Sequence, residues 1–292
     1  MKLENYHPIA MFAYFMSVIF LTMFLQNPII ICLSYFGAVC FCFCLYDYKI
    51  MLNSLVSSML LIALMTLINP LIVHRGVTEL LFINGKPITL EAILYGLFTT
   101  IMLVSVFYWF KAYNKLMTSD KFLYLFSRFT PKIAVMLSMS MGFIPTLKRE
   151  YSSIKESSMA LGIYTGDNFV DKLKSNFRIT SILFTTAIEG SIEKAESMQA
   201  RGYNIKGRKS FSLYRFKKSD TLLFLTNILL LVMIITLLAL DFGRFNYYPI
   251  MSKITANACE ILLYVASGIL YFLGMIISIK ECVLWKISQS KM

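Results

Sequence analysis

The sequence predicts an all-α, polytopic membrane protein with about six transmembrane helices and a cytoplasmic domain of amphipathic helices. Three observations predict this fold class. Only 15% of the 292 residues are charged and 58% are hydrophobic, whereas soluble domains carry about 25% charged residues. Long stretches contain no charged residue, and their lengths match the ~20 apolar residues that cross a bilayer. The positive charges gather in one segment in the middle of the chain.

The charge-free stretches set the bounds of the predicted spans. No Asp, Glu, Lys or Arg lies between Glu4 and Asp47. Asn27-Pro28 is expected to form a tight turn that divides this stretch, because proline disfavours helical geometry in the residue before it. The same criterion bounds the remaining helices. The predicted spans are about 9–25, 29–46, 51–70, 90–110, 221–240 and 256–279.

Residues 111–219 carry most of the net charge of +12. They hold 19 of the 28 Lys and Arg but 8 of the 16 Asp and Glu, a surplus of 11 positive charges. Basic segments stay on the cytoplasmic side, so this charge indicates membrane topology rather than nucleic-acid binding. The chain therefore divides into residues 1–110 with four spans, a cytoplasmic domain in 111–219, and residues 220–292 with two spans. Both termini are then expected in the cytoplasm.

The cytoplasmic domain is predicted to contain two long amphipathic helices. Its apolar runs, 133–145 and 179–188, are too short to span a bilayer, and each continues into a stretch with apolar residues at helical spacing. Both helices are expected to end at a glycine in the left-handed conformation. Their ends, ESSMALG and ESMQARG, share the pattern E-S-x-x-A-x-G. The candidate docking residues at these two tips are Ala160, Leu161, Gly162, Ala200, Arg201 and Gly202.

A purely structural role accounts for one such tip. Alanine packs, glycine terminates the helix, and Arg201 complements the helix dipole. Two similar tips on consecutive long helices favour a pair of docking surfaces. The methionines of the same helices are interpreted as core residues, with an adaptable partner surface as the alternative. These methionines are Met136, Met139, Met141, Met159 and Met198.

The familiar motifs of catalytic and cofactor sites are missing from the sequence. The chain has no G-x-x-x-x-G-K-[ST] phosphate loop, no H-E-x-x-H and no G-x-S-x-G. The cysteines of CFCFC at 40–44 are interpreted as packing residues rather than metal ligands, because Cys42 points away from the helix face shared by Cys40 and Cys44. We therefore expect no catalytic residue, no bound metal and no cofactor in this chain.

Four longer stretches carry a more specific signal: NPLIVHRGVTELLFINGKPITLEAILYGL (69–97), WFKAYNKLMTSDKFLYLF (109–126), MSMGFIPTLKREY (139–151) and SMQARGY (197–203). They resemble the transmembrane T component of energy-coupling factor (ECF) transporters, the EcfT or CbiQ family. The resemblance implies a non-catalytic scaffold and energy-coupling subunit of an ATP-driven importer in the cell membrane. Such a subunit links two ATPases, which bind the ATP, to a substrate-binding S component for vitamin or metal-ion uptake.

The resemblance also implies a role for the two tips. In the family, cytoplasmic coupling helices end in two short motifs with a central arginine, and each motif docks on one ATPase. Arg201 matches the central arginine of the second motif. Leu161 stands at that position in the first motif, so an apolar contact or a weaker one replaces the charge there. The alternative function is a substrate-binding permease subunit of another ABC importer, which clustered polar residues inside the membrane would favour.

Labelling of single cysteines tests the predicted topology. On a cysteine-less background, we expect Ser212→Cys to be protected from an impermeant thiol reagent in intact cells and Asn246→Cys to be labelled. The reason is that the surplus of positive charge holds residues 111–219 inside. The fraction of labelled protein is measured by mass spectrometry. Labelling of Ser212→Cys from outside, or protection of Asn246→Cys, would contradict the topology.

Overall fold

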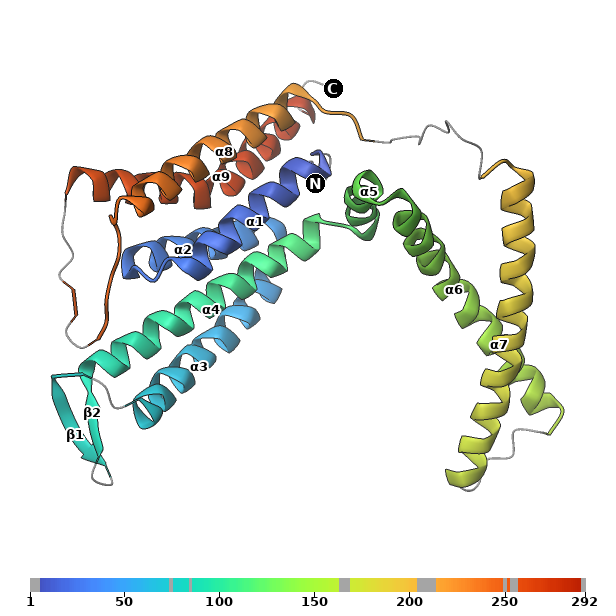
Figure 1. Cartoon of the computed structure of the whole chain (residues 1–292). Helices are drawn as coiled ribbons and strands as arrows, with labels where there is room; N and C mark the ends of the chain where they lie inside the picture. Colours follow the sequence, from blue (N-terminus) through green and yellow to red (C-terminus); the bar gives the residue numbers. More distant parts are fainter. Residues whose placement is uncertain are drawn as a thin grey trace. The chain divides into compact units, whose positions relative to one another are not determined.

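A computed structural model of the chain describes residues 6–73, 76–83, 86–162, 169–203, 214–248, 251–252 and 257–289. The described residues form nine helices and one two-stranded sheet, so the predicted helical membrane fold is confirmed (Figure 1). The chain folds as two compact units. The first contains residues 1–122 and 214–292, and the second contains residues 123–213.

The first unit holds the predicted membrane-spanning helices. Five of them are long and apolar enough to cross a bilayer, and α1, with 17 residues, is apolar but shorter. The predicted number of six spans is therefore approximate. Helix α4 continues past the predicted end at residue 110, so Lys111 and Lys115 lie on this helix. The helices of the first unit are α1 (Pro8–Phe24), α2 (Pro28–Leu45), α3 (Tyr48–Ile72), α4 (Leu90–Leu116), α8 (Lys218–Ala239) and α9 (Ala258–Gln289).

Helices α1 and α2 begin in the same way. Asn27 accepts a hydrogen bond from Ile29 N through Oδ1 (3.1 Å), and Pro28 is the first helical residue. A capping side chain satisfies a backbone N–H that has no partner within the helix, and proline has no N–H to satisfy at the first position. The predicted turn at Asn27-Pro28 is thereby confirmed. His7 and Pro8 repeat the arrangement at the start of α1, where His7 Nδ1 accepts from Ile9 N (3.3 Å).

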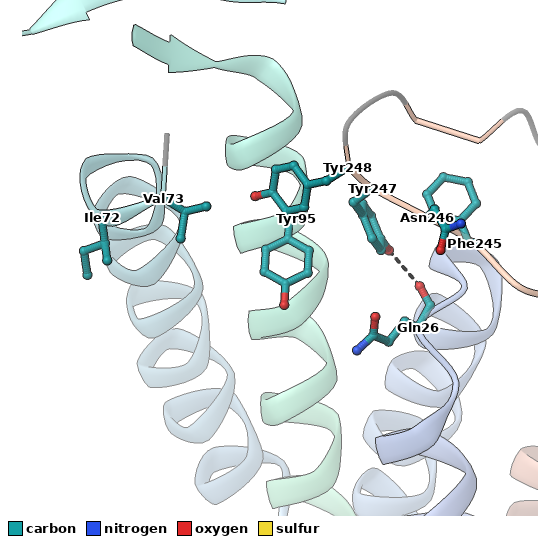
Figure 2. Close-up of a pocket in the computed structure, with 8 residues that line it drawn as sticks. All are labelled: Gln26, Ile72, Val73, Tyr95, Phe245, Asn246, Tyr247 and Tyr248. Atoms are coloured by element: carbon teal, nitrogen blue, oxygen red, sulfur yellow. Dashed lines mark hydrogen bonds between the residues drawn. The ribbon is translucent and has the colours of Figure 1, made fainter. Parts of the chain in front are cut away.

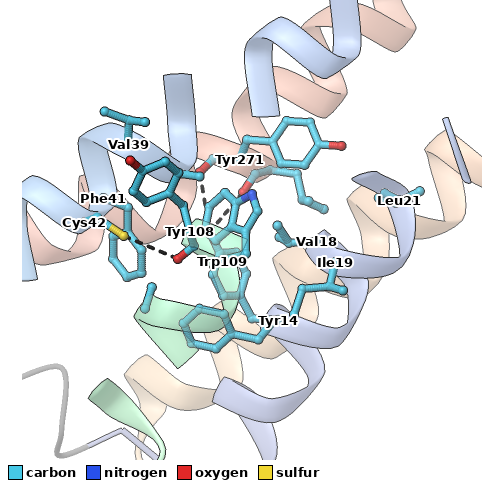
Figure 3. Close-up of a cluster of buried hydrophobic side chains, with 14 of the residues drawn as sticks. Tyr14, Val18, Ile19, Leu21, Val39, Phe41, Cys42, Tyr108, Trp109 and Tyr271 are labelled. Carbon is cyan, nitrogen blue, oxygen red and sulfur yellow. Dashed lines mark hydrogen bonds between the residues drawn. The ribbon is translucent and has the colours of Figure 1, made fainter. Parts of the chain in front are cut away.

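Five helices of the first unit pack in a ring. Helix α4 contacts α1 and α2, α2 contacts α9, α9 contacts α8, and α8 contacts α1. Helix α3 lies outside this ring and packs mainly against α4. The largest fully buried side chain is Trp109 on α4, with Tyr14, Phe41 and Tyr271 around its ring (Figure 3). The ring of helices thus closes around an aromatic core.

Hydroxyl groups inside this core are bonded to one another. Ser34 Oγ on α2 lies 2.8 Å from Thr22 Oγ1 on α1 and 2.8 Å from Ser105 Oγ on α4. It also accepts a hydrogen bond from Trp109 Nε1 (3.1 Å). Helix α9 joins through Tyr271, whose hydroxyl accepts from Thr22 Oγ1 (3.5 Å). Polar groups at membrane depth need partners inside the protein, and these bonds supply them across four helices.

A β-hairpin follows α3, between the third and fourth predicted spans, where no strand is predicted from the sequence. Strands β1 (Glu79–Ile83) and β2 (Lys86–Thr89) pair antiparallel. The sequence does contain a hairpin signal, because Asn-Gly is the preferred dipeptide of a two-residue hairpin turn. This dipeptide is Asn84-Gly85, which lies outside the described residues. The hairpin is a small addition to a helical fold.

Glu91, in the first turn of α4, fixes the hairpin to that helix. Its carboxylate is buried and accepts hydrogen bonds from Thr78 N (3.2 Å) and Thr78 Oγ1 (2.7 Å). Gly76 packs against the same carboxylate at φ +144°, where a Cβ would lie 2.6 Å from Oε2. A side chain at position 76 would therefore be strained and would displace Glu91. A negative charge also suits the N-terminus of a helix.

The chain re-enters the first unit beside the start of α1. The His7 ring stacks on Phe216 with centroids 3.8 Å apart, and His7 N donates to Asp220 Oδ1 (3.1 Å). Asp220 Oδ2 accepts from Lys217 N (2.9 Å), which caps α8. One carboxylate thus holds the beginnings of two helices that are more than two hundred residues apart in sequence.

Replacing Ser34 with alanine tests the importance of the hydroxyl cluster. Ser34→Ala leaves Trp109 Nε1 and the hydroxyls of Thr22 and Ser105 without their shared partner. We expect the free energy of unfolding in detergent to fall by about 1–3 kcal/mol, since interhelical hydrogen bonds contribute roughly 0.6–1.7 kcal/mol each. Thermal unfolding followed by circular dichroism measures the change. Ser219→Ala, on the exposed side of α8, is the matched control, and an equal loss in both variants would contradict the assignment.

Candidate functional site: the tips of the α6–α7 helix pair

Two long helices form most of the second unit. Helix α6 (Pro131–Ala160) has 30 residues and α7 (Phe169–Ala200) has 32, which gives lengths of about 45 and 48 Å. Helix α5 (Ser119–Phe129) precedes them. The two predicted amphipathic helices are therefore continuous, and Pro145 lies inside α6 without ending it.

Helix α7 runs in the opposite direction to α6, so the C-terminal ends of the two helices lie far apart, at opposite ends of the pair (Figure 1). Ser158 on α6 and Ile179 on α7 are both buried, although few residues of the pair are. Lys194 Nζ lies 3.8 Å from the centroid of the Phe143 ring, where a cation is attracted to the face of an aromatic ring. The contact between the two helices is narrow, and most of both surfaces remains open.

Both helices end at glycine, as the sequence predicts. Gly202 has φ +75°, its N–H donates to Gln199 O (2.9 Å), and Tyr203 N donates to Met198 O (3.0 Å). This is the Schellman arrangement, in which a left-handed residue satisfies the last carbonyls of the helix. Gly162 ends α6 with φ +69° and donates to Met159 O (3.0 Å). The helix terminates at Ala200, so Arg201 is the residue after the last turn rather than within it.

The side chains of the two tips face outward. Leu161 is 73% exposed, and Ala160, Gly162, Ala200 and Arg201 are also exposed, while Gly202 is half-buried. The guanidinium of Arg201 forms no ion pair or side-chain hydrogen bond with any residue that the structure describes. A cation with five donors in a fixed plane is thus available for a carboxylate on another molecule. The structure brings together the three residues of each tip but keeps the two tips apart.

A groove beside Arg201 was not predicted from the sequence. Its volume is about 340 Å³, and residues from both helices line it. The lining residues of α6 and those at the end of α7 are some sixty residues apart in sequence, so no local sequence pattern indicates the groove. The lining residues are Val135, Ser138 and Met139 of α6, followed by Met198, Arg201 and Tyr203.

The interpretation of the methionines as core is wrong for three of the five. Met136, Met141 and Met159 are 66%, 45% and 47% exposed, whereas Met139 and Met198 are half-buried. The physical reason is that two helices shield only the sides on which they touch. The second unit therefore presents a large apolar surface, which on a protein marks an interaction site. Its most exposed aromatic side chains include Phe169, Phe177 and Phe184.

The first unit contains a second concave site, at the end of the bundle where α4 begins (Figure 2). The cavity is about 560 Å³ in volume. Tyr247 donates its hydroxyl to Gln26 O (2.9 Å) and packs edge-on against Tyr95. Burial raises the pKa of the Tyr247 phenol well above its ordinary value, so this group remains a hydrogen-bond donor. The cavity is lined by Gln26, Ile72, Val73, Tyr95, Phe245, Asn246, Tyr247 and Tyr248.

These features define a class of protein: a multi-pass helical membrane protein with a separate pair of long amphipathic helices that expose two glycine-ended tips. The chain belongs to the family described as Cobalt transport protein (CbiQ), whose sequence profile matches residues 5–213. The family predicted from the four sequence stretches is therefore confirmed, and the chain is a transmembrane component of a transporter. The matched region includes all six candidate docking residues.

Curated relatives carry the same assignment. The chain is 36% identical over 97 residues to the energy-coupling factor transporter transmembrane protein EcfT of Listeria innocua, which covers 32% of this chain and 37% of the relative. The chain is 30% identical over 106 residues to EcfT of Lactococcus lactis subsp. cremoris, an alignment that covers 36% of this chain and 40% of the relative. It is 31% identical over 110 residues to EcfT of Bacillus subtilis, an alignment that covers 37% of this chain and 42% of the relative. The alignments thus span about two-fifths of the length of these relatives.

Two glycine-to-alanine changes on α7 are expected to act in opposite directions. Gly202→Ala forces a side chain into φ +75°, which costs about 1 kcal/mol, so amide exchange at the end of α7 should accelerate roughly fivefold. Gly190→Ala, inside the same helix, meets no atom within 4 Å and should stabilise it by up to about 1 kcal/mol. Hydrogen–deuterium exchange measures both. Equal effects of the two substitutions would rule out a terminating role for Gly202.

Proposed function

We propose that this protein is the transmembrane scaffold and energy-coupling subunit of an ATP-driven ECF importer in the cell membrane. The observation that carries the proposal is the pair of exposed, glycine-ended tips at opposite extremes of two long helices. Each tip docks on one of two ATPase subunits, which bind and hydrolyse ATP. This chain then supplies no catalytic group and no cofactor, and it transmits the movement of the ATPases.

The chemistry of the two tips supports two different contacts. Arg201 offers an uncommitted guanidinium beside an apolar groove, which suits a carboxylate flanked by an apolar side chain on the ATPase. Leu161 offers only an exposed apolar side chain, so its partner surface is an apolar recess. Gly162 and Gly202 hold both contacts at a fixed place on the helix end. The proposed docking residues remain Ala160, Leu161, Gly162, Ala200, Arg201 and Gly202.

The uncovered surface of the helix pair supports contact with a membrane S component. This surface is apolar and contains three exposed methionines, which can repack against a moving partner. The S component, rather than this chain, then selects the vitamin or metal ion. The surplus of positive charge in residues 111–219 supports an orientation with this segment and both termini in the cytoplasm.

The 560 Å³ cavity favours a second candidate function, a permease subunit that binds the substrate itself. Its four aromatic rings and two amide side chains have the composition of a small-molecule site. Equilibrium binding of transported substrates to the purified chain without any S component distinguishes the two functions. Binding by the chain alone would support the permease, and binding only in the presence of an S component would support the scaffold.

Charge reversal at Arg201 tests ATPase docking. We expect Arg201→Glu to lower the recovery of one ATPase at least tenfold in pull-downs at equal membrane abundance, because a like-charge clash in a desolvated contact costs several kcal/mol. Arg178→Glu makes the same charge change on an exposed part of α7 and is the matched control. Leu161→Ala should weaken the other ATPase by roughly 2–5 kcal/mol if the side chain is fully buried in the complex.

Salt separates the two contacts in the same assay. Docking through Arg201 should weaken as salt rises, since ions screen exposed charges over ~10 Å at 0.1 M, whereas docking through Leu161 should persist. Recovery of both ATPases from Arg201→Glu at the level of Arg178→Glu would leave Arg201 as a helix cap only and would remove the main support for the proposal.

A further inference from the structure

A polar groove lies between α3 and α4 on the outside of the helix ring. It has a volume of about 170 Å³ and carries four hydroxyl groups and one ammonium group between apolar neighbours. Hydroxyl clusters of this kind are unusual on a surface that faces lipid, because no water is present to bond them. The groove is lined by Ser54, Ser57, Ser58 and Leu61 of α3 and by Val104, Phe107, Tyr108 and Lys111 of α4.

Two of the four hydroxyls are bonded to described residues of the protein, and the other two form no such bond. Tyr108 donates its hydroxyl to Ser58 Oγ (3.0 Å), and Ser58 donates to Leu55 O (2.9 Å). The hydroxyls of Ser54 and Ser57 form no hydrogen bond with a residue inside the described ranges. Serine in a helix commonly bonds back to a carbonyl of the preceding turn, as Ser58 does here. Ser54 and Ser57 therefore have donors available for a ligand.

Lys111 lines the groove, and Lys115 lies one turn further along α4, beside the same tyrosine ring as Lys111. Lys111 Nζ is 4.9 Å and Lys115 Nζ is 5.5 Å from the centroid of the same Tyr46 ring. Neither ammonium is paired with a carboxylate in the described part of the chain. Two like charges held beside one ring repel each other, and a bound anion would relieve that repulsion. Tyr46 fixes the place of this charge, since its hydroxyl donates to Lys111 O (3.1 Å).

The groove lies where the membrane changes from polar to apolar. Lys111 and Lys115 are in the last two turns of α4, and Ser54 is about 9 Å from the start of α3 by the helical rise of 1.5 Å per residue. Further along the same two helices, Leu60, Leu64 and Leu103 are 71%, 50% and 47% exposed. Along the outer surface of α3 and α4, the lysines are thus followed by the serine hydroxyls and then by exposed apolar side chains.

We propose that this groove binds the headgroup of an anionic phospholipid. Lys111 and Lys115 neutralise its charge, Ser54 and Ser57 donate to phosphate or glycerol oxygens, and the acyl chains lie over the exposed residues beyond them. Basic recesses between transmembrane helices bind anionic headgroups in this way. An apolar helix of a neighbouring protein would instead leave both ammonium groups buried without a counter-charge. The site is independent of ATPase docking.

Native mass spectrometry of the purified full chain tests the site, with phosphatidylglycerol and phosphatidylcholine of identical acyl chains as the probes. We expect phosphatidylglycerol to be retained preferentially, and the double variant Lys111→Gln/Lys115→Gln to lower this preference roughly tenfold. Lys218→Gln/Lys280→Gln is the matched control, because it removes two exposed lysines of α8 and α9, and neither helix lines the groove. An equal loss in both double variants would show only general attraction to the membrane surface and would overturn the proposal.

The serines provide a second readout that does not depend on charge. Ser54→Ala/Ser57→Ala should weaken retention of both lipids, since both carry a phosphate, and should leave the preference between them unchanged. Ser57→Leu, which blocks the groove, should abolish retention of both while the protein still inserts. Displacement of phosphatidylglycerol by inorganic phosphate alone, or normal retention by Ser57→Leu, would contradict a lipid site. Burial of the groove by a second protein chain, detected as protection of Ser57→Cys from a membrane-soluble thiol reagent, would contradict it too.

Discussion

Hydrogen bonding in the absence of water is the constraint on which the membrane part of this protein depends. Ser34 Oγ on α2 is the shared hydrogen-bond partner of Thr22 on α1 and of Ser105 and the Trp109 indole on α4, so it satisfies polar groups of three helices. Close packing alone does not select one arrangement of apolar helices, because lipid is as apolar as the helices themselves. The shared hydroxyl cluster does select one, since other arrangements would leave its members without partners.

The second unit, unlike the first, leaves most of its apolar side chains exposed. It has almost no interior, and its long helices expose apolar side chains such as Met136, Phe177 and Leu161. A separate folding domain of this composition would be expected to bury these groups. Their exposure is consistent with a part that completes its core only with partner proteins, whereas the first unit contains a core of its own. A transmembrane component of a transporter, the family to which the chain belongs, agrees with one unit that has its own core and a second unit with an open apolar surface.

Some of this structure could be predicted from the sequence because the signals are local. Stretches without charge identified the spans, proline after Asn27 identified a turn, and the glycines at 162 and 202 identified helix ends. The hairpin was not predicted although Asn84-Gly85 signals it, because only apolar stretches and charges were used to divide this part of the chain. The groove beside Arg201 could not be predicted, since it forms where two distant segments meet. The exposed methionines were misassigned because amphipathic spacing shows a face but not whether this chain covers it.

The re-entry of the chain beside α1 has a consequence for biosynthesis. His7 and Tyr14 bond to groups on α8 or α9, and Ser17 bonds to Asn227 on α8. These partners lie more than two hundred residues downstream. At about 5–20 residues per second, the ribosome needs roughly ten seconds or longer to reach them. During that interval the groups of α1 that bond to α8 and α9 lack these partners, although Thr22 can already bond to Ser34 on α2. Contact with the insertion machinery would therefore stabilise α1 until the last two helices arrive.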